Sequence, residues 1–330
     1  MSLPERTLSY REAVLEALFS EMRASPHVVM IGEDIGAAGG VFQQSKGLFE
    51  EFGASRIIDT PISEPGSFGM AVGAAMTGLR PVFEVMFNDF ITLILDQLMN
   101  QAAKIHYLSD GAYSVPLVVR TTMGTGSFLG AQHSQSLYAL PAHIPGLKVV
   151  VPAFPDDAKG LMAAAVRDDN PVLFFEDRLL YNRTGPVPEG DYFCPLGKAT
   201  VRRLGRDVTV VGIGRMVHVA LDAAEELAQE GIEVEVIDVR SLVPLDVETI
   251  ADSVRKTNRA LVVDGGHRQF GASSEIAMQI CEHAFDWLDA PVERLAGADV
   301  PIPLATNLEP LTQPGRAAIV SSVRQMVGNR

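Results

Sequence analysis

The most informative segment of this chain is Asp59-Thr-Pro-Ile-Ser-Glu64-Pro-Gly-Ser-Phe-Gly-Met-Ala-Val-Gly-Ala-Ala75. A single carboxylate, Glu64, lies between a proline-bounded turn and a run of glycine and alanine. Small residues such as Gly69 and Gly73 let a helix approach another backbone or a flat ligand closely. A carboxylate beside such apolar residues is partly desolvated, which raises its pKa. The segment predicts a glutamate that shares a proton with a weakly basic ligand nitrogen, and the alternative is a glutamate that only complements a helix dipole.

Length and composition are those of a two-domain globular protein. The chain has 330 residues, of which 47% are hydrophobic, and this is enough for two domains with a large buried core. The net charge of −14 argues against nucleic acid and anionic membranes as partners, because both attract basic surfaces. Cys194 and Cys281 are the only cysteines, which excludes a disulfide framework and a cysteine zinc site.

The sequence shows no targeting or membrane pattern. Residues 9–22 mix acidic and basic groups, unlike a transit peptide, and no secretory apolar region precedes them. The most apolar stretch, 68–87, is interrupted by Arg80, Pro81 and Glu84, so it is not a membrane span. We therefore expect a cytoplasmic protein with no membrane partner.

Helix and strand patterns alternate along the N-terminal half. Ser9-Tyr-Arg-Glu12 is a capping box followed by apolar residues at i+4 spacing, which predicts an early amphipathic helix. A long helix is predicted over 90–107, and another, capped by Asp156, extends to Val166. Buried strands are predicted at 28–31, 81–86, 116–120, 148–151 and 171–176.

The same alternation returns in the C-terminal half. Strands are predicted at 208–211, 234–239, 260–263 and near 292, and helices at 218–229, 247–255, 273–285 and 315–327. Between the halves the sequence turns to Gly, Pro and Glu with little periodicity. We therefore predict a domain at 1–183, a linker at 184–197 and a domain at 198–330. Both domains are predicted to be open, doubly wound α/β folds with mainly parallel sheets.

A partial dinucleotide fingerprint lies in the second half. Gly212-Ile-Gly214 follows a predicted strand and opens a helix, with Asp238 at the end of the next strand. Val217 stands where the third glycine of the fingerprint belongs. A nicotinamide-dependent dehydrogenase is therefore one hypothesis, and a tight strand-to-helix turn is the alternative.

Three other places carry polar candidates. His133 follows a long polar loop, 121–130, and its neighbours Gln132, Ser134 and Gln135 can fix its tautomer, as a proton donor requires; a structural histidine that caps a helix is the alternative. The run Arg167-Asp-Asp-Asn170 offers oxygen ligands that suit a hard cation, although such turns commonly only cap a helix. His267 is predicted to be a surface histidine in a turn.

Taken together, these segments resemble the beta subunit of the thiamine-diphosphate-dependent 2-oxo acid dehydrogenases, in the transketolase-like superfamily. The resemblance covers nearly the whole chain and includes the pyruvate, acetoin and branched-chain types. Its markers are Asp59-Thr-Pro-Ile-Ser-Glu64, Val72-Gly-Ala-Ala75, Asp96-Gln97, Asn100-Gln-Ala-Ala-Lys104, Gln132-His-Ser-Gln135, Pro145-Gly-Leu-Lys-Val-Val150, Asp157-Ala-Lys-Gly160 and Arg167-Asp-Asp-Asn-Pro171.

The resemblance implies roles for single residues. Glu64 matches the glutamate that hydrogen-bonds a ring nitrogen of the cofactor's aminopyrimidine and shares a proton there. Phe90 matches the aromatic residue that packs on this ring, and His133 matches the histidine near the reacting substrate. Glu33 and Asp96 match acidic positions between paired cofactors.

The resemblance also implies a structural potassium ion. The matching segment comprises Leu117, Ala165, Val166, Asp168 and Asn170. The first three residues would contribute backbone carbonyl oxygens.

One motif of the family is absent. The Gly-Asp-Gly motif that holds Mg²⁺ and the diphosphate does not occur, since Val263-Asp-Gly-Gly266 does not fit. A separate alpha subunit should therefore bind that end of thiamine diphosphate in an α2β2 assembly. The C-terminal domain resembles the one that dimerises and docks onto an acyltransferase core.

The implied activity is oxidative decarboxylation of a 2-oxo acid such as pyruvate, or acetoin cleavage, with acyl transfer to a lipoyl group. A branched-chain 2-oxo acid is the alternative substrate. A transketolase-like half without a lipoyl acceptor is the alternative enzyme.

Overall fold

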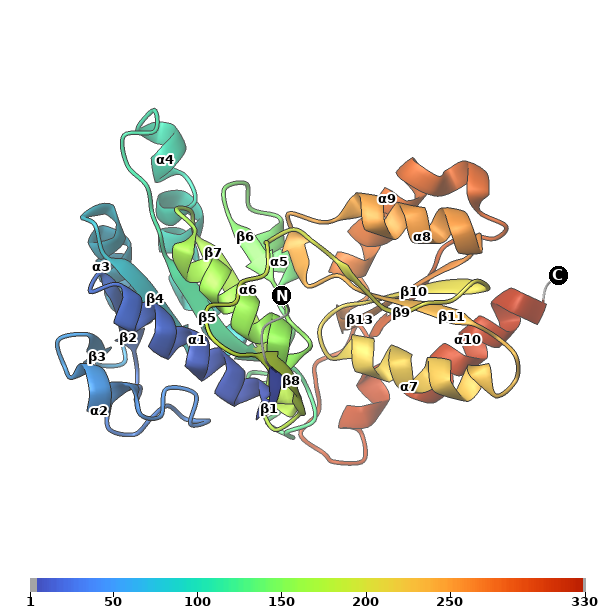
Figure 1. Cartoon of the computed structure of the whole chain (residues 1–330), viewed down its shortest axis with the longest axis horizontal. Helices are drawn as coiled ribbons and strands as arrows, with labels where there is room; N and C mark the ends of the chain where they lie inside the picture. The colour runs from blue at the N-terminus through green and yellow to red at the C-terminus, as the bar shows by residue number, and fades with distance from the viewer. Residues whose placement is uncertain (1–4, 329–330) are drawn as a thin grey trace. The chain divides into compact units, whose positions relative to one another are not determined.

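A computed structural model describes residues 5–328. The chain separates into two compact units, each with its own sheet (Figure 1). The first unit contains the residues up to Met123 and Leu140–Leu196, and the second contains Gly124–Ala139 and the residues from Gly197 onward. The loop that carries His133 therefore belongs to the second unit.

The first unit is built on parallel strands in the order β6-β7-β5-β4-β2-β3. Apolar runs form these strands, and most of their residues are buried, as expected of a parallel sheet covered on both faces. The strands are β2 (Val28–Gly32), β3 (Ile57–Asp59), β4 (Arg80–Val85), β5 (Val118–Met123), β6 (Lys148–Val150) and β7 (Val172–Asp177). The helices are α1 (Tyr10–Ala24), α2 (Leu48–Phe52), α3 (Glu64–Met76), α4 (Ile105–Leu108) and α6 (Pro155–Arg167).

Helices cover both faces of this sheet. Helices α1 and α6 pack together in the core cluster that contains Val82 of β4. The next residue of β4, Phe83, stacks edge-on against Phe68 of α3 with ring centroids 5.0 Å apart. Because successive strand residues point to opposite faces, α3 lies on the face opposite α1 and α6.

The start of α1 confirms the predicted capping box. Ser9 Oγ accepts a hydrogen bond from the Glu12 backbone N–H at 3.3 Å. The Glu12 carboxylate accepts in turn from the Ser9 backbone N–H at 2.8 Å. The two contacts satisfy donors that the first helical turn leaves open.

The second unit has the strand order β14-β13-β10-β11-β9. All its pairs are parallel except β9–β11. Helices α8 and α9 lie on one side of the sheet, and α7 and α10 lie on the other (Figure 1). The strands of this sheet are β9 (Thr200–Arg203), β10 (Val208–Gly212), β11 (Val234–Asp238), β13 (Ala260–His267) and β14 (Glu293–Gly297), and the short β12 (Ser241–Val243) is not part of it. The helices are α7 (Met216–Ala228), α8 (Val247–Thr257), α9 (Ala272–Ala284) and α10 (Arg316–Gly328).

Two helix predictions were wrong in detail. The segment 90–107 is not one long helix, because a 3-10 helix (Asn88–Ile94), a π-helical turn (Gln97–Ala102) and α4 divide it. The π turn holds an extra residue, which shifts the side chains that follow to another face. Asp156 does not cap α6, since Pro155 already occupies the first helical turn, where its fixed φ and missing N–H suit the geometry.

The expected linker begins with regular structure. Strand β8 (Thr184–Pro188) pairs antiparallel with β1 (Glu5–Ser9). The domain boundaries at 183 and 198 stay a prediction. No helix among the described residues combines the length and the apolar character that a membrane span requires.

Candidate functional site

A small hollow lies at the carboxyl edge of the first unit's sheet. It is lined by Gly32, Glu33, Glu64, Phe83, Glu84, Val85, Met86 and Phe90. Strands β2 and β4 end here, and the chain crosses from β2 to β3 on one side and returns to β4 on the other. Such a reversal of strand order is where open α/β sheets bind ligands.

The hollow brings together three of the residues singled out in the sequence. Glu33 directly follows β2, Glu64 is the first residue of α3, and Phe90 lies in the 3-10 helix after β4. All three side chains are half-buried. Parallel strands place their carboxyl ends at one edge, which is why residues so distant in sequence meet here.

Asp96 is not part of the hollow. It is exposed, and its carboxylate accepts a hydrogen bond from Asn100 Nδ2 at 2.7 Å. Its assignment to a position between paired cofactors stays a prediction.

Electrostatics favour a proton on Glu33. Burial, followed by the charges of Glu64 and Asp34, raises the pKa of Glu33. Two carboxylates that share one site disfavour simultaneous ionisation. The hollow is therefore suited to hold and share protons.

Glu84 is a site residue that the sequence reasoning missed. It lies on β4, its side chain is 1% exposed, and it lines the hollow. Its Oε1 accepts a hydrogen bond from Gln44 Nε2 at 3.0 Å. Burial is the main cause that raises the pKa of Glu84 to about 7. An acidic residue inside an apolar strand of the sequence was the available signal.

A buried ion pair lies behind Glu84. Arg120 and Glu176 form a salt bridge with two contacts, of which the Nη2–Oε2 distance is 3.1 Å. Arg120 Nη1 also donates to the Gln44 carbonyl at 2.7 Å. The arrangement satisfies both charges, as a buried pair requires.

His133 lies in the polar loop of the second unit and is half-buried. The buried Glu309 accepts a hydrogen bond from the Gly126 backbone N–H at 3.0 Å, and Arg215 Nη2 donates to Thr125 Oγ1 at 3.2 Å. These contacts hold the loop that precedes His133. Its catalytic role stays a prediction.

Basic side chains from other strands bind the segment that was predicted to hold potassium. Arg80 Nη1 donates to the carbonyl oxygens of Val166 and Asp168 at 3.1 and 3.0 Å. Arg80 Nη2 pairs with the Asp169 carboxylate at 2.5 Å. The Leu117 and Ala165 carbonyls accept backbone hydrogen bonds, at 2.9 and 3.3 Å.

Basic side chains pair with both acidic residues at this turn, Arg80 with Asp169 and Lys148 with Asp168. Although burial opposes it, hydrogen bonds from Lys148 and Asn170 lower the pKa of Asp168. The oxygen donors suit a hard monovalent ion in type, but the segment carries no surplus negative charge. Within residues 5–328, no group of three or more His, Cys, Asp or Glu side chains is placed to hold a metal ion.

The dinucleotide hypothesis is not supported by the geometry. Asp238 is buried, and its carboxylate accepts from Arg202 Nη2 at 3.1 Å and from the Arg240 backbone N–H at 3.2 Å. A Cβ on Gly212 would lie 2.9 Å from the Val217 backbone. Gly212 therefore allows the strand-to-helix turn to pack closely against Val217. The carboxylate of Asp238 is already bound by Arg202 and Arg240.

Known families match both units. Residues 6–184 match the family described as "Transketolase, pyrimidine binding domain", and residues 197–319 match "Transketolase, C-terminal domain". A solved structure, "Split gene transketolase, inactive beta4 tetramer", is similar in fold, with a TM-score of 0.78 and 24% identity, and covers 97% of this chain and 98% of its own.

Curated relatives share nearly half of the residues. The beta subunit of acetoin:2,6-dichlorophenolindophenol oxidoreductase from Bacillus subtilis is 47% identical, with 98% of each chain covered. The beta subunit of the pyruvate dehydrogenase E1 component from Rhizobium meliloti is 46% identical, over 96% of this chain and 69% of its own. The corresponding subunit from Rickettsia felis is 44% identical, over 97% of this chain and 98% of its own.

Proposed function

Since this chain belongs to the family of pyruvate and acetoin dehydrogenase E1 beta subunits, with transketolase-type pyrimidine-binding and C-terminal domains, we propose that it is the beta subunit of a 2-oxo acid or acetoin dehydrogenase complex. The proposed activity is decarboxylation of a 2-oxo acid such as pyruvate, or cleavage of acetoin, followed by acyl transfer to a lipoyl group. The observation that carries the proposal is the shared hollow of Glu33, Glu64 and Phe90.

The residues of the hollow fit the pyrimidine end of thiamine diphosphate. When bound, this cofactor supplies the electron sink for decarboxylation. Glu64 would share a proton with a ring nitrogen, and the half-buried Phe90, which meets Phe87 edge-on at 5.7 Å, would support the face of the ring. Glu33 would hold a second proton beside Glu64. The chain's own contribution is thus to orient the ring and to manage its protons.

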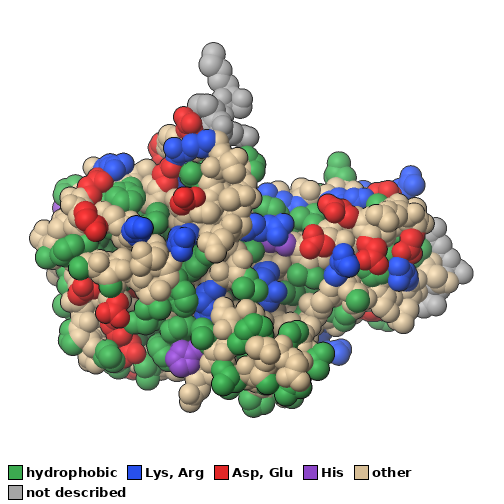
Figure 2. All heavy atoms as spheres, turned by 90° about the horizontal axis from the view of Figure 1, so that it is seen from below, with side chains coloured by type: hydrophobic (Ala, Val, Ile, Leu, Met, Phe, Trp, Pro, Cys, Tyr) green, Lys and Arg blue, Asp and Glu red, His purple; other side chains and the backbone are tan. Residues whose placement is uncertain are grey.

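We propose that an alpha subunit completes the site in an α2β2 heterotetramer. The chain has no Gly-Asp-Gly motif, so another polypeptide would hold the diphosphate and Mg²⁺. Helix α3 offers a surface for such a partner, because a Cβ on Gly73 would meet no atom within 4 Å, and the nearby Met70 and Ile62 are 49% and 84% exposed. Figure 2 shows that hydrophobic side chains also reach the surface at several places on one face.

Reconstitution tests this proposal directly. The isolated chain is expected to bind thiamine diphosphate weakly and to turn over no substrate. Co-expression with an alpha subunit that bears a Gly-Asp-Gly motif should restore both, as measured by calorimetry and by dye reduction. Tight cofactor binding by the isolated chain would contradict the split site.

The same preparation identifies the substrate class. Pyruvate, acetoin and branched-chain 2-oxo acids are compared as substrates. Acyl transfer to a lipoyl domain separates a dehydrogenase subunit from a transketolase-like half, which would use no lipoyl acceptor.

We infer a cytoplasmic location from the mixed charges of residues 9–22, which differ from a transit peptide. Relatives from rice and Arabidopsis, by contrast, are named as mitochondrial.

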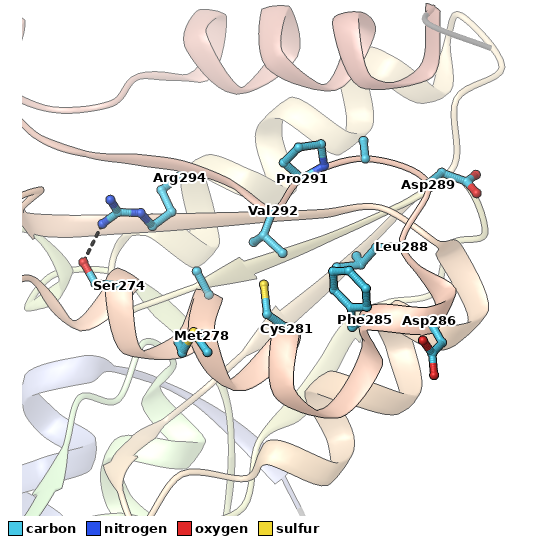
Figure 3. A pocket seen from close by; sticks show the side chains of 12 residues that line it. Ser274, Met278, Cys281, Phe285, Asp286, Leu288, Asp289, Pro291, Val292 and Arg294 are labelled. Atoms are coloured by element: carbon cyan, nitrogen blue, oxygen red, sulfur yellow. Dashed lines mark hydrogen bonds between the residues drawn. The ribbon is translucent and has the colours of Figure 1, made fainter.

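We also propose that the second unit docks onto an acyltransferase core. A groove between α9 and β14 is lined by apolar side chains, among them Met278, Cys281 and Phe285 (Figure 3). Phe285 and Trp287, in the turn after α9, are 71% and 46% exposed. Exposed apolar surface of this kind marks a binding face. Arg294, fixed by a 2.6 Å hydrogen bond to Ser274 Oγ, gives one end of the groove a positive charge (Figure 3).

We also propose a structural potassium ion, which is supported by the resemblance to the dehydrogenase beta subunits. The residues that would hold it are Leu117, Ala165, Val166, Asp168 and Asn170. Such an ion would bind through second lone pairs of the carbonyls, beside Arg80. Binding to the folded state alone raises stability by mass action. The melting temperature is therefore expected to be several degrees higher in potassium chloride than in choline chloride at equal ionic strength. An equal melting temperature in both salts would contradict potassium binding. In that case the Arg80 guanidinium would be the cation that these carbonyl oxygens bind.

A further inference from the structure

The loop that carries His133 is held by a buried carboxyl group that is itself poorly partnered. Glu309 begins a short 3-10 helix and is 1% exposed. Its Oε2 accepts the hydrogen bond from the Gly126 backbone N–H at 3.0 Å, whereas its Oε1 is buried and accepts none. Within residues 5–328, no basic side chain forms an ion pair with this carboxyl group. Glu309 thus contributes one acceptor to the loop and leaves the other empty.

Stability does not explain a carboxyl group at this place. A buried polar group without its full set of partners costs free energy. Replacing an incompletely paired buried group by an apolar side chain of similar volume is often neutral or stabilising. Residues that lower stability are typical of functional sites. The hydrogen bond to Gly126 is the only one that the Glu309 carboxyl group makes, so it is the contact through which this group acts.

The loop around Gly126 has no regular structure to keep its shape. Residues 124–135 belong to no helix or strand. The backbone is left-handed at Gly126, with φ of 98°, and at Phe128, with φ of 54°, a conformation that side-chain-bearing residues rarely adopt. Such backbone persists only where the surrounding structure holds it. The hydrogen bonds of Glu309 and Arg215 supply this hold from outside the loop.

The loop closes on itself, and the closure connects Gly126 to His133. The Gly124 backbone N–H donates to the Gln135 carbonyl oxygen at 3.1 Å. Along the chain, Gly126 comes two residues after one side of this closure, and His133 comes two residues before the other side. The two residues therefore lie on the two limbs of one closed loop. A movement of the first limb is transmitted to His133 through the closure.

The limb that carries His133 leaves the loop at a different anchor. Tyr138 is buried and donates a hydrogen bond to the carboxylate of Asp264. Asp264 also accepts from the backbone N–H groups of Gly266 and Ser273, at 2.7 and 2.9 Å. Both oxygens of Asp264 are thus partnered, unlike those of Glu309, so the Tyr138 anchor is consistent with a structural role.

We propose that Glu309 is a positioning residue for His133. Its hydrogen bond to Gly126 fixes the first limb of the loop, at a cost in stability, and so keeps the imidazole where acyl transfer needs a proton. Without this bond the loop would populate several conformations, and His133 would be correctly placed in only a fraction of the molecules. The role in acyl transfer rests on the proposed function, but the hold on the loop does not.

The hold on the loop is tested on the complete chain without cofactor. In Glu309→Met, which has a similar size but no acceptor, amide hydrogen exchange over residues 124–135 should be about tenfold faster than in the wild type, the usual effect of one lost hydrogen bond. Exchange in the strands of the second unit should not change. Glu309→Gln keeps a carbonyl oxygen for Gly126 and should exchange like the wild type.

The melting temperatures of the same variants separate positioning from a purely structural role. Glu309→Met should melt at or above the temperature of the wild type, because it removes a buried oxygen that has no partner. A variant that melts several degrees lower, or that does not fold, would show that Glu309 serves stability and would overturn the proposal. Unchanged exchange in the loop of Glu309→Met would also overturn it.

The role in the reaction is tested on the reconstituted pair. Glu309→Met should lower kcat for acyl transfer to a lipoyl domain by about tenfold, in step with the loss of the hydrogen bond, and Glu309→Gln should recover most of the rate. Glu225 is exposed on α7 in the same unit. Glu225→Met is therefore the matched control and should leave the rate unchanged. Equal rates in the wild type and Glu309→Met would overturn the role.

A double-mutant cycle shows whether Glu309 acts through His133. In a His133→Gln background, Glu309→Met should lower acyl transfer no further, because the effect of a positioning residue disappears with the residue that it positions. An equal loss in both backgrounds would overturn the positioning role. A wild-type pair without any activity would refute the proposed function, and with it the role of Glu309 in the reaction, while the exchange result still decides whether Glu309 holds the loop.

Discussion

Glu64→Gln is expected to lower kcat of the reconstituted enzyme by a factor on the order of 10²–10⁴, because the variant cannot transfer a proton at the ring nitrogen. Glutamine has nearly the same shape, and Glu64 lies at the first turn of α3 with its side chain half-buried. Folding and assembly should therefore be preserved. Steady-state kinetics with saturating thiamine diphosphate measure the effect.

Two comparisons give this result its meaning. Cofactor affinity, measured by calorimetry, should change far less than kcat, since the interaction lost is one made during the reaction. Glu50→Gln removes an exposed carboxylate from the same unit and should leave kcat unchanged. Normal turnover by Glu64→Gln would falsify the assigned role and leave only the helix-dipole explanation.

His133→Gln is expected to lower acyl transfer to a lipoyl domain by a factor on the order of 10²–10⁴, the usual contribution of a positioned proton donor. Reduction of an artificial dye should fall less, because a dye needs no proton delivered to a leaving sulfur. The Bacillus subtilis relative is named for reducing 2,6-dichlorophenolindophenol, so both acceptors can be compared on one preparation.

The control for His133 is another histidine. His143 is exposed, and its replacement by glutamine should alter neither activity. A His133→Gln enzyme that loses both activities equally would place the residue in the decarboxylation step. One that loses neither would show that His133 has only a structural role in its loop.

Local sequence patterns predicted the parts of this fold that depend on local chemistry. The apolar runs that became β2, β4 and β7 were correct within a few residues, and so was the capping box at Ser9. Phe90, by contrast, was singled out beside Glu33 and Glu64 by the family resemblance and not by a local pattern. The strand runs and the capping box need no knowledge of distant contacts.

Features that depend on tertiary packing were missed. Glu84 is visible in the sequence only as an acid in an apolar strand, and its partners Gln44 and Arg120 come from other parts of the chain. The helix predicted over 90–107 has helical periodicity, yet packing divides it into three pieces. A local pattern also cannot tell which core a loop such as 124–139 will join.

The loop 124–139 interleaves the two units, since it leaves the first unit after Met123 and returns to it at Leu140. A chain truncated near residue 196 would keep the loop but lose Glu309 and Arg215, which hold Gly126 and Thr125. The gene thus cannot be cut at one point into two self-contained modules. If the C-terminal halves of two relatives were exchanged, the loop that bears His133 would come from one protein and the residues that bind it from the other. Such a chimera would hold the loop only if the contacts made here by Glu309 and Arg215 were preserved.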